Sequence, residues 1–244
     1  MNRMKSGALL LGLFALAACT DTVGPDTIED TLTDDVAMIL ADAVIDGFSD
    51  LGLLFGGGAA LASGGPSTRS GTHTATFYDE NGVEQDARDP LTTASIHLVI
   101  ESTHEFSRDS WSATGTRSRD LMITGLLGEE TSRTVNGTGR GTVSRSRHTD
   151  DAGTRTYDMT STSVIKDVVH PVPRTDDAWP LSGTITRNVT ITIVDGTDDP
   201  VTKNRTGVVT FNGTNLVVLT VDGEIFEIDL STRSDRRPFR RRGQ

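Results

Sequence analysis

A period-two alternation of apolar and polar residues is the feature that most restricts how this chain can fold. From about residue 72 onward the pattern recurs in segments such as 94–100, 184–193 and 226–230. Threonine, which favours strands over helices, occurs 36 times. Successive side chains of a strand point to opposite faces, so the pattern predicts antiparallel strands with one apolar and one wet face. We expect a mainly β fold, either a long, curved antiparallel sheet or a partly open barrel.

One tight turn can be placed from the sequence. The dipeptide Asp222-Gly223 lies between two strand-like segments, 216–221 and 224–230. An Asp-Gly pair favours the two-residue turns whose twist matches that of the flanking strands. This pair therefore predicts a β-hairpin.

The middle of the chain predicts an unusually long hairpin. Its arms would be residues 131–147 and 154–169, each on the order of 50 Å long, so we expect the sheet to bend. Two separate, shorter hairpins are the alternative. Gly137, Gly139 and Gly141 fall on one face of the first arm, where alternate glycines indicate a bend or a close approach by another element.

The N-terminus has the form of a secretory signal. Residues 1–18 contain two cations, an apolar run and small residues before a cleavage point. The apolar run is shorter than the ~20 residues that span a membrane. The signal ends in Leu16-Ala17-Ala18-Cys19, which resembles the lipobox of bacterial lipoproteins.

This resemblance implies that Cys19, the only cysteine of the chain, becomes the lipidated first residue of the mature protein. In that family an Asp after the Cys often retains the protein at the inner membrane. Thr20 stands at that position, so the resemblance implies a lipid anchor, with palmitate, in the bacterial outer membrane and a body in the periplasm or at the cell surface. An uncleaved anchor or a plain secretory signal is the alternative.

Composition divides the rest of the chain into segments of different character. The signal peptide precedes a polar tether, and a Gly- and Ser-rich linker precedes the strand-forming region. The expected boundaries are 1–18 for the signal peptide, 19–32 for the tether, 33–55 for a helix, 56–71 for the flexible linker, 72–232 for an antiparallel β body with a possible subdivision near 171–180, and 233–244 for a basic tail.

Residues 33–51 predict one amphipathic helix. Thr33 can cap it, and Asp34 and Asp35 lie in the first turn, where the helix dipole favours anions. Apolar residues recur at helical spacing up to Leu51, with acids on the other face. We expect the helix to pack on the core of its own domain, as a candidate to lie across the glycine face. A helix lying on a membrane is disfavoured because its polar face is acidic.

Charge is unevenly distributed along the chain. The formal net charge is −11, but the signal carries two cations and the tail six against one acid, which leaves 15 cations and 33 anions between them. Such a body should repel nucleic acid and anionic surfaces, whereas the tail would attract an anionic envelope component or a protein partner. The tail contact residues would be Arg236, Arg237, Arg240, Arg241 and Arg242.

The sequence contains no convincing catalytic or metal-binding motif. None of the five histidines has a metal-site spacing, and no second cysteine is available, so we expect neither metal nor cofactor. Ser163 and Lys166 match the spacing of the Ser-x-x-Lys motif, which works on a helix. In a strand, positions three apart point to opposite faces, so coincidence is the simpler interpretation.

These observations favour a non-catalytic envelope lipoprotein, a β module that binds a ligand or partner while tethered to the outer membrane. The alternative is a carrier of lipid or another apolar ligand on a concave sheet, an architecture broadly similar to that of the lipoprotein carriers of the periplasm. Arg133, Arg145 and Arg147 on the glycine face argue against an apolar ligand there. An envelope hydrolase is the third hypothesis.

Overall fold

In a computed structural model, the described residues form one antiparallel sheet of 11 strands. The structure describes residue 37 and residues 67–108, 111–149, 153–173, 178–196, 199–231 and 239–241. Within these residues, the order of strands in the sheet is β11-β10-β9-β8-β7-β6-β5-β4-β3-β1-β2. Strands that are consecutive in sequence are therefore neighbours in the sheet, except that β1 lies between β3 and β2. The expected mainly β fold is confirmed.

Long strands make up the middle of the sheet, and short ones its ends. The bounds are β1 Ser67–Tyr78, β2 Glu84–Gln85, β3 Ser95–Arg108, β4 Trp111–Thr124, β5 Ser132–Thr149, β6 Gly153–Pro171, β7 Ser182–Asp195, β8 Val201–Thr210, β9 Leu216–Val221, β10 Glu224–Asp229 and β11 Phe239–Arg241.

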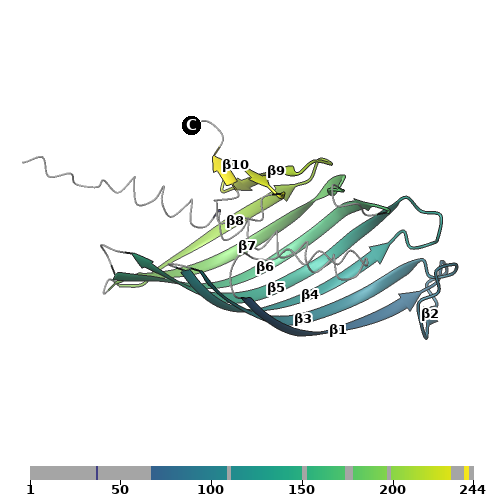
Figure 1. Cartoon of the computed structure of the whole chain (residues 1–244), viewed down its shortest axis with the longest axis horizontal. Helices are drawn as coiled ribbons and strands as arrows, with labels where there is room; N and C mark the ends of the chain where they lie inside the picture. The colour runs from purple at the N-terminus through teal and green to yellow at the C-terminus, as the bar shows by residue number, and fades with distance from the viewer. Residues whose placement is uncertain are drawn as a thin grey trace, which may run out of the picture.

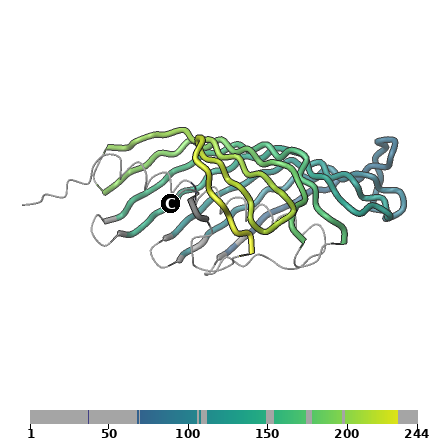
Figure 2. The backbone as a smooth tube through the Cα atoms, turned by 90° about the horizontal axis from the view of Figure 1, so that it is seen from above, coloured from purple at the N-terminus to yellow at the C-terminus, as the bar shows by residue number. Residues whose placement is uncertain are grey.

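The sheet is strongly curved but does not close into a barrel. Figure 1 shows the strands forming a trough, with β9 and β10 curling over at one end of the strand order and β1 and β2 at the other. Seen from above in Figure 2, the long strands run obliquely beneath the short terminal ones. A sheet of this size curves because the right-handed twist of its strands accumulates from one to the next.

The long central hairpin is confirmed, and the alternative of two short hairpins is wrong. Strand β5 has 18 residues and β6 has 19, and they pair from Ser132↔Pro171 to Thr149↔Gly153. The register shifts once, between Val135 and Gly137, which marks a β-bulge. The hairpin at Asp222-Gly223 is also confirmed, since β9 pairs with β10 across it.

Two boundaries differ from those expected. Strand β1 starts at Ser67 instead of residue 72, and all 12 of its residues pair with β3. Gly71 permits this because a Cβ there would lie 2.4 Å from the backbone oxygen of Glu101. Part of the basic tail is also a strand, since β11 extends the sheet beside β10.

The segment at 171–180 does not separate two sheets. It contains the cis peptide bond Val172-Pro173, and it links β6 to β7. These two strands pair directly, from Arg155↔Asp195 to Val169↔Ser182. The strands before and after the connection therefore belong to one continuous sheet.

The helix expected over 33–55 lies outside the described residues, except for Ala37. Ala37 has helical backbone conformation and is completely buried. It belongs to the same apolar cluster as the buried side chains of the sheet. Among the described residues, no helix is long and apolar enough to cross a membrane.

Candidate functional site

The pairing of the strands assigns every strand residue to one of two faces. Residues directly opposite one another on neighbouring strands share a face, and successive residues alternate. We call the face that carries Leu121 and its cross-strand neighbours Leu98 and Gly137 the inner face, and the face that carries Met122 the outer face. Leu121 is completely buried, whereas Met122 is 39% exposed.

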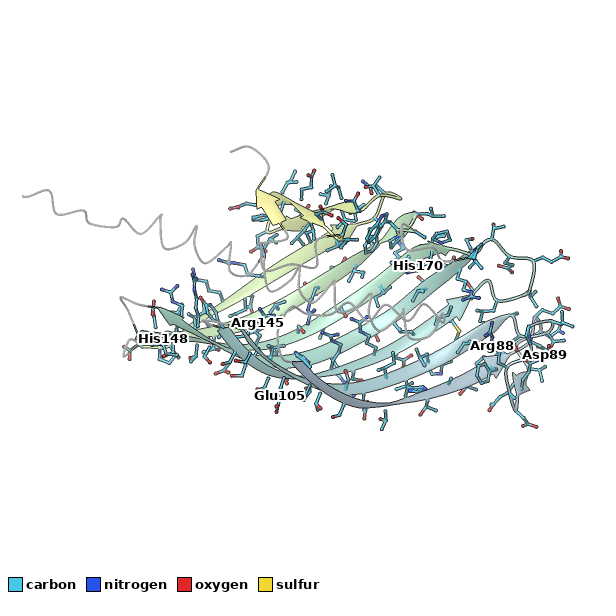
Figure 3. The ribbon with its side chains drawn as sticks, viewed as in Figure 1. Arg88, Asp89, Glu105, Arg145, His148 and His170 are labelled. Carbon is cyan, nitrogen blue, oxygen red and sulfur yellow. The ribbon has the colours of Figure 1, made fainter. Side chains whose placement is uncertain are left out.

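Positive charge gathers on the inner face. Following the register from β1 to β10 places only two lysines or arginines of these described strands, Arg140 and Lys166, on the outer face. In Figure 3, Arg145 lies within the trough and Glu105 on its convex side. The inner-face cations whose side chains are described are Arg117, Arg119, Arg133, Arg145, Arg147, Arg155, Arg187, Lys203 and Arg205.

Acids and threonines occupy the opposite face. The outer face carries Glu101, Glu105, Asp120 and Asp158, while Asp195 and Glu224 are the acids that fall on the inner face of the described strands. Every threonine of these strands whose side chain is described lies on the outer face. The two faces therefore differ both in charge and in side-chain type.

At the centre of the inner face, arginines lie among small residues. Arg119 is 8% exposed and Arg145 is 7% exposed. A guanidinium N–H of Arg187 donates a hydrogen bond to the Ser161 hydroxyl oxygen at 2.7 Å. A small hollow here is lined by Arg119, Ser163, Ile165, Ile185, Arg187, Gly207, Val209 and Leu219.

The glycines of β5 leave room for these side chains. A Cβ on Gly139 would lie 2.6 Å from the Ser163 hydroxyl oxygen, and one on Gly141 would lie 2.7 Å from the Thr116 backbone oxygen. At Gly141 a larger residue would require movement of the neighbouring strand, whereas at Gly139 the Ser163 side chain would have to turn away. The close approach expected from the alternate glycines is thus made by adjacent strands of the same sheet.

Apolar side chains lie beside the arginines on the same face. They belong to one cluster, with members on every strand from β3 to β10. Completely buried members include Leu98, Leu121, Ile123, Val135, Tyr157, Ile191, Leu219 and Phe226. The inner face thus combines guanidinium groups with an apolar surface.

Two inner-face arginines form ion pairs. Arg155 on β6 pairs with Asp195 on β7, with the Arg155 Nε 2.8 Å from the carboxylate. This hydrogen bond raises the pKa of Arg155 above its usual value against the opposing effect of burial. The side chains of this pair are 18% and 31% exposed, so the pair is only partly screened by water.

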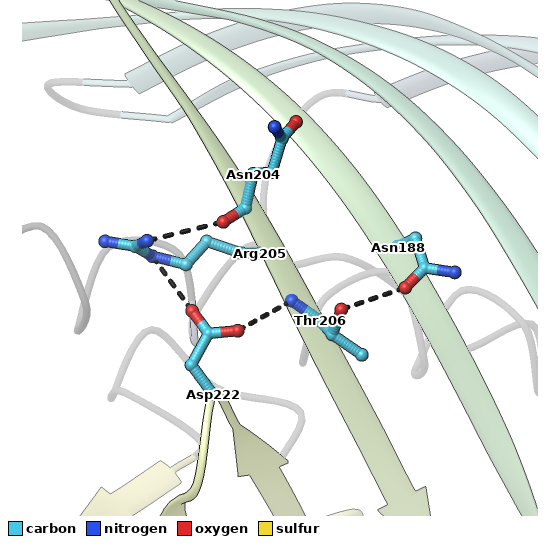
Figure 4. A network of polar contacts seen from close by, with 5 residues as sticks. All are labelled: Asn188, Asn204, Arg205, Thr206 and Asp222. Atoms are coloured by element: carbon cyan, nitrogen blue, oxygen red, sulfur yellow. Dashed lines mark hydrogen bonds and ion pairs between the residues drawn. The ribbon is translucent and has the colours of Figure 1, made fainter.

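The second pair belongs to a polar network shown in Figure 4. Arg205 Nε lies 3.1 Å from an Asp222 carboxylate oxygen, and the other oxygen accepts a hydrogen bond from the Thr206 backbone N–H at 2.9 Å. The Thr206 hydroxyl donates to the Asn188 side-chain oxygen at 2.9 Å, and Arg205 also donates to the Asn204 carbonyl at 3.3 Å. The network ties the turn of β9 and β10 to β8.

Another inner-face arginine, Arg133, lies at the start of β5. Arg133 faces His170 across the β5–β6 pairing, and His170 is 3% exposed. Burial lowers the pKa of the Arg133 guanidinium, and the positive charge of Arg88 lowers it further. Figure 3 shows Arg88 and His170 toward the same end of the sheet.

The outer face also has a hollow, but of different chemistry. It is open, has a volume of ≈ 570 Å³ and is lined largely by hydroxyl side chains, with Glu105 and Asp158 among them. Two of these hydroxyls, those of Thr116 and Thr142, bond to one another across strands at 2.8 Å. The outer face therefore offers acids and mutually bonded hydroxyl groups, without the cations of the inner face.

Of the lipidation and tail residues predicted from the sequence, the structure describes only two. Cys19, Arg236, Arg237 and Arg242 lie outside the described residues. Arg240 and Arg241 are in β11, opposite Glu227 and Phe226 of β10. The structure therefore places part of the expected contact tail at the edge of the sheet.

Ser163 and Lys166 do lie on opposite faces, as expected for a strand. Ser163 pairs with Arg187 on the inner face, and Lys166 pairs with Thr184 on the outer face. Sequence reasoning noticed three arginines of β5 but missed the inner-face cations on the other strands. The sequence does contain a signal for these cations, because each of them has threonine, serine or asparagine next to it in a period-two pattern.

Within the described ranges, no group of three His, Cys, Asp or Glu side chains is arranged to hold a metal ion. The residues that can make strong polar contacts with a ligand here are the inner-face guanidinium groups, which suit carboxylates and phosphates. Comparison with protein-family models, with curated proteins and with solved structures finds no match to this chain.

Proposed function

We propose that this protein is a non-catalytic binding module of the bacterial envelope, lipid-anchored to the outer membrane through Cys19, whose inner face takes an anionic, partly apolar ligand. The anchor rests on the lipobox-like Leu16-Ala17-Ala18-Cys19. The ligand class rests on the inner face, where the strand cations lie beside the apolar cluster. That segregation of charge is the observation that carries the proposal.

The proposed ligand has both an anionic group and an apolar portion. A neutral apolar ligand has no anionic group for the inner-face guanidinium groups to bind. A small inorganic anion gains nothing from the apolar surfaces. A molecule with a phosphate or carboxylate and a hydrocarbon portion satisfies both, because guanidinium groups bind such anions in a planar, two-point manner.

The first experiment asks what the protein carries. The full chain with Cys19→Ala, exported to the periplasm of its own host and purified gently, is examined by native mass spectrometry. A co-purifying anionic lipid supports the proposal. If a neutral lipid is the adduct, the alternative of an apolar-ligand carrier is favoured instead, and a protein adduct would point to a partner-binding module.

A second experiment tests the cations directly. Arg145→Gln removes a buried inner-face charge, and Arg140→Gln is its matched control on the outer face of the same strand. We expect Arg145→Gln to weaken binding of lysophosphatidylglycerol about tenfold or more, as for the loss of one hydrogen bond to a charged group. Arg140→Gln should change it less than twofold.

Lysophosphatidylcholine provides the comparison ligand in the same titrations. Its headgroup has no net charge, so the proposal expects weaker binding and a smaller response to Arg145→Gln. Equal loss of affinity in Arg140→Gln and Arg145→Gln, or equal binding of the two lipids, would contradict an inner-face anion site. Circular dichroism on each variant checks that the sheet is intact.

A further inference from the structure

We propose that residues 33–51 of the same chain dock on the inner face and supply acidic partners to its arginines. They thereby occupy the surface that an external anionic ligand would use. The inference about competition rests on the proposed function, whereas the docking itself does not. Residues 33–51 are identified as the docked segment by their negative charge and by one buried residue, Ala37.

The buried residue is Ala37. It is 0% exposed and belongs to the apolar cluster formed by inner-face side chains such as Leu121, Val135 and Ile191. Its backbone is helical. An alanine far from the sheet in sequence can be buried in that cluster only if the chain around it reaches the inner face.

Charge complementarity favours the same partner. Between Lys5 and Arg69 the chain contains no lysine or arginine, and the segment 33–51 carries Asp34, Asp35, Asp42, Asp46 and Asp50. The outer face already carries acids and would repel it, whereas the inner face carries the strand cations. Aspartates beside partly buried guanidinium groups interact more strongly than they would in water.

The amphipathic pattern fits a concave surface. The predicted helix has an apolar stripe on one side and acids at 35, 42, 46 and 50 along another. A trough surrounds its occupant on more than one side. The apolar stripe can therefore contact the apolar side chains of the inner face, while long arginine side chains from neighbouring strands reach the acids.

The dimensions also fit. A helix over 33–51 would be about 28 Å long, whereas a strand such as β5, at 18 residues, extends for about 60 Å. Residues 52–66 join the segment to the start of β1, and this stretch can span about 50 Å. The connection is therefore long enough for the segment to reach the centre of the inner face.

Cysteine labelling at position 37 tests the docking without any ligand. In the full chain with Cys19→Ala, Ala37→Cys provides the one thiol, which should react slowly because Ala37 is buried. Replacing Asp42, Asp46 and Asp50 with Asn removes three negative charges and should raise the labelling rate of this thiol at least tenfold. The matched control, Asp26→Asn with Glu29→Gln and Asp30→Asn, removes as much charge from the tether and should leave the rate within twofold.

The inner-face side of the contact has its own control. Arg119→Gln with Arg145→Gln should speed labelling of the thiol introduced by Ala37→Cys, whereas Arg140→Gln with Lys166→Gln, on the outer face, should not. High salt should speed labelling of the parent, because it screens these ion pairs. Slow labelling that none of these changes alters would overturn the acid–arginine docking.

Competition is then measured separately. If the segment occupies the ligand surface, the Asp42, Asp46 and Asp50 to Asn variant should bind lysophosphatidylglycerol several-fold more tightly than the parent. Faster labelling with unchanged lipid affinity would retain the docking and reject the competition. Should no variant bind the lipid, the proposed function fails while the labelling result still decides the docking.

Discussion

The inner and outer faces of this sheet are made from alternate residues of the same strands, yet they have different chemistry. The inner face combines buried apolar side chains with almost all the strand cations, and the outer face combines threonine with acids. Neighbouring residues such as Leu121 and Met122 therefore have different roles. A net charge of −11 describes the chain as a whole but conceals a basic surface.

The largest expected difference between the faces is in packing. Leu121→Ala removes a completely buried side chain and should lower the free energy of unfolding by about 2–5 kcal/mol. Met122→Ala, at an outer-face position, should change it by about 0.5 kcal/mol or less. Urea unfolding monitored by circular dichroism measures both, and equal losses would show that the two faces do not differ in packing.

The next effect concerns the glycines of the inner face. A Cβ at Gly137 would lie 2.2 Å from the Asp120 backbone oxygen, whereas Gly82, also at positive φ, has nothing within 4 Å. Gly82→Ala should therefore cost about 1 kcal/mol from backbone strain alone. Gly137→Ala should cost about 1–3 kcal/mol more because neighbouring strands must move. Similar losses in chemical denaturation would show that close strand approach is unimportant at Gly137.

A smaller effect separates two polar side-chain contacts, one on each face. Asp195→Asn breaks the inner-face ion pair with Arg155 and should cost about 1 kcal/mol. Asp120→Asn alters the outer-face hydrogen bond with His97; because the Asp120 side chain is 64% exposed, this change should cost about 0.5 kcal/mol or less. Thermal unfolding at low and high salt compares them. A larger loss for Asp120→Asn would reverse the expected order.

The smallest effect is a pH dependence at Asp229 on the outer face. Burial disfavours its charge, but hydrogen bonds from Ser231 and Asn215 outweigh this and hold the pKa of the carboxyl below its usual value. A lowered pKa stabilises the fold above about pH 4, and the contribution disappears as pH falls through the folded-state pKa.

Melting temperatures of the parent and Asp229→Asn should therefore differ at pH 7 and converge toward pH 2. Asn215→Ala, which removes one donor to the same carboxylate, should reduce the pH-dependent part without abolishing it. A difference that stays constant between pH 7 and pH 2 would show that the ionised form of Asp229 is not what stabilises the hairpin.

Strands and turns were predictable because their signals are local. The alternation in 184–193 predicts β7, and Asp222-Gly223 predicts the turn between β9 and β10. The start of β1 was missed because Ser67 to Gly71 has the composition of a linker. Those residues form a strand only because β3 is available to pair with them.

The candidate site was predictable only in part. The arginines at 133, 145 and 147 could be placed on one face of one strand, since period two determines faces within a strand. Whether Arg119 and Arg187 share that face depends on the registers of two further strand pairs. A shift of one residue in either would have moved them to the other side.

The β class, the long central hairpin and the alternation of chemistry along each strand could be predicted from the amino-acid sequence, because they depend on residues close together in the chain. That the strands form one curved sheet, with their basic positions on the same side, became clear only from the three-dimensional arrangement. The physical reason is that cross-strand hydrogen bonding and burial of one apolar face choose the register, and these contacts join residues far apart in sequence.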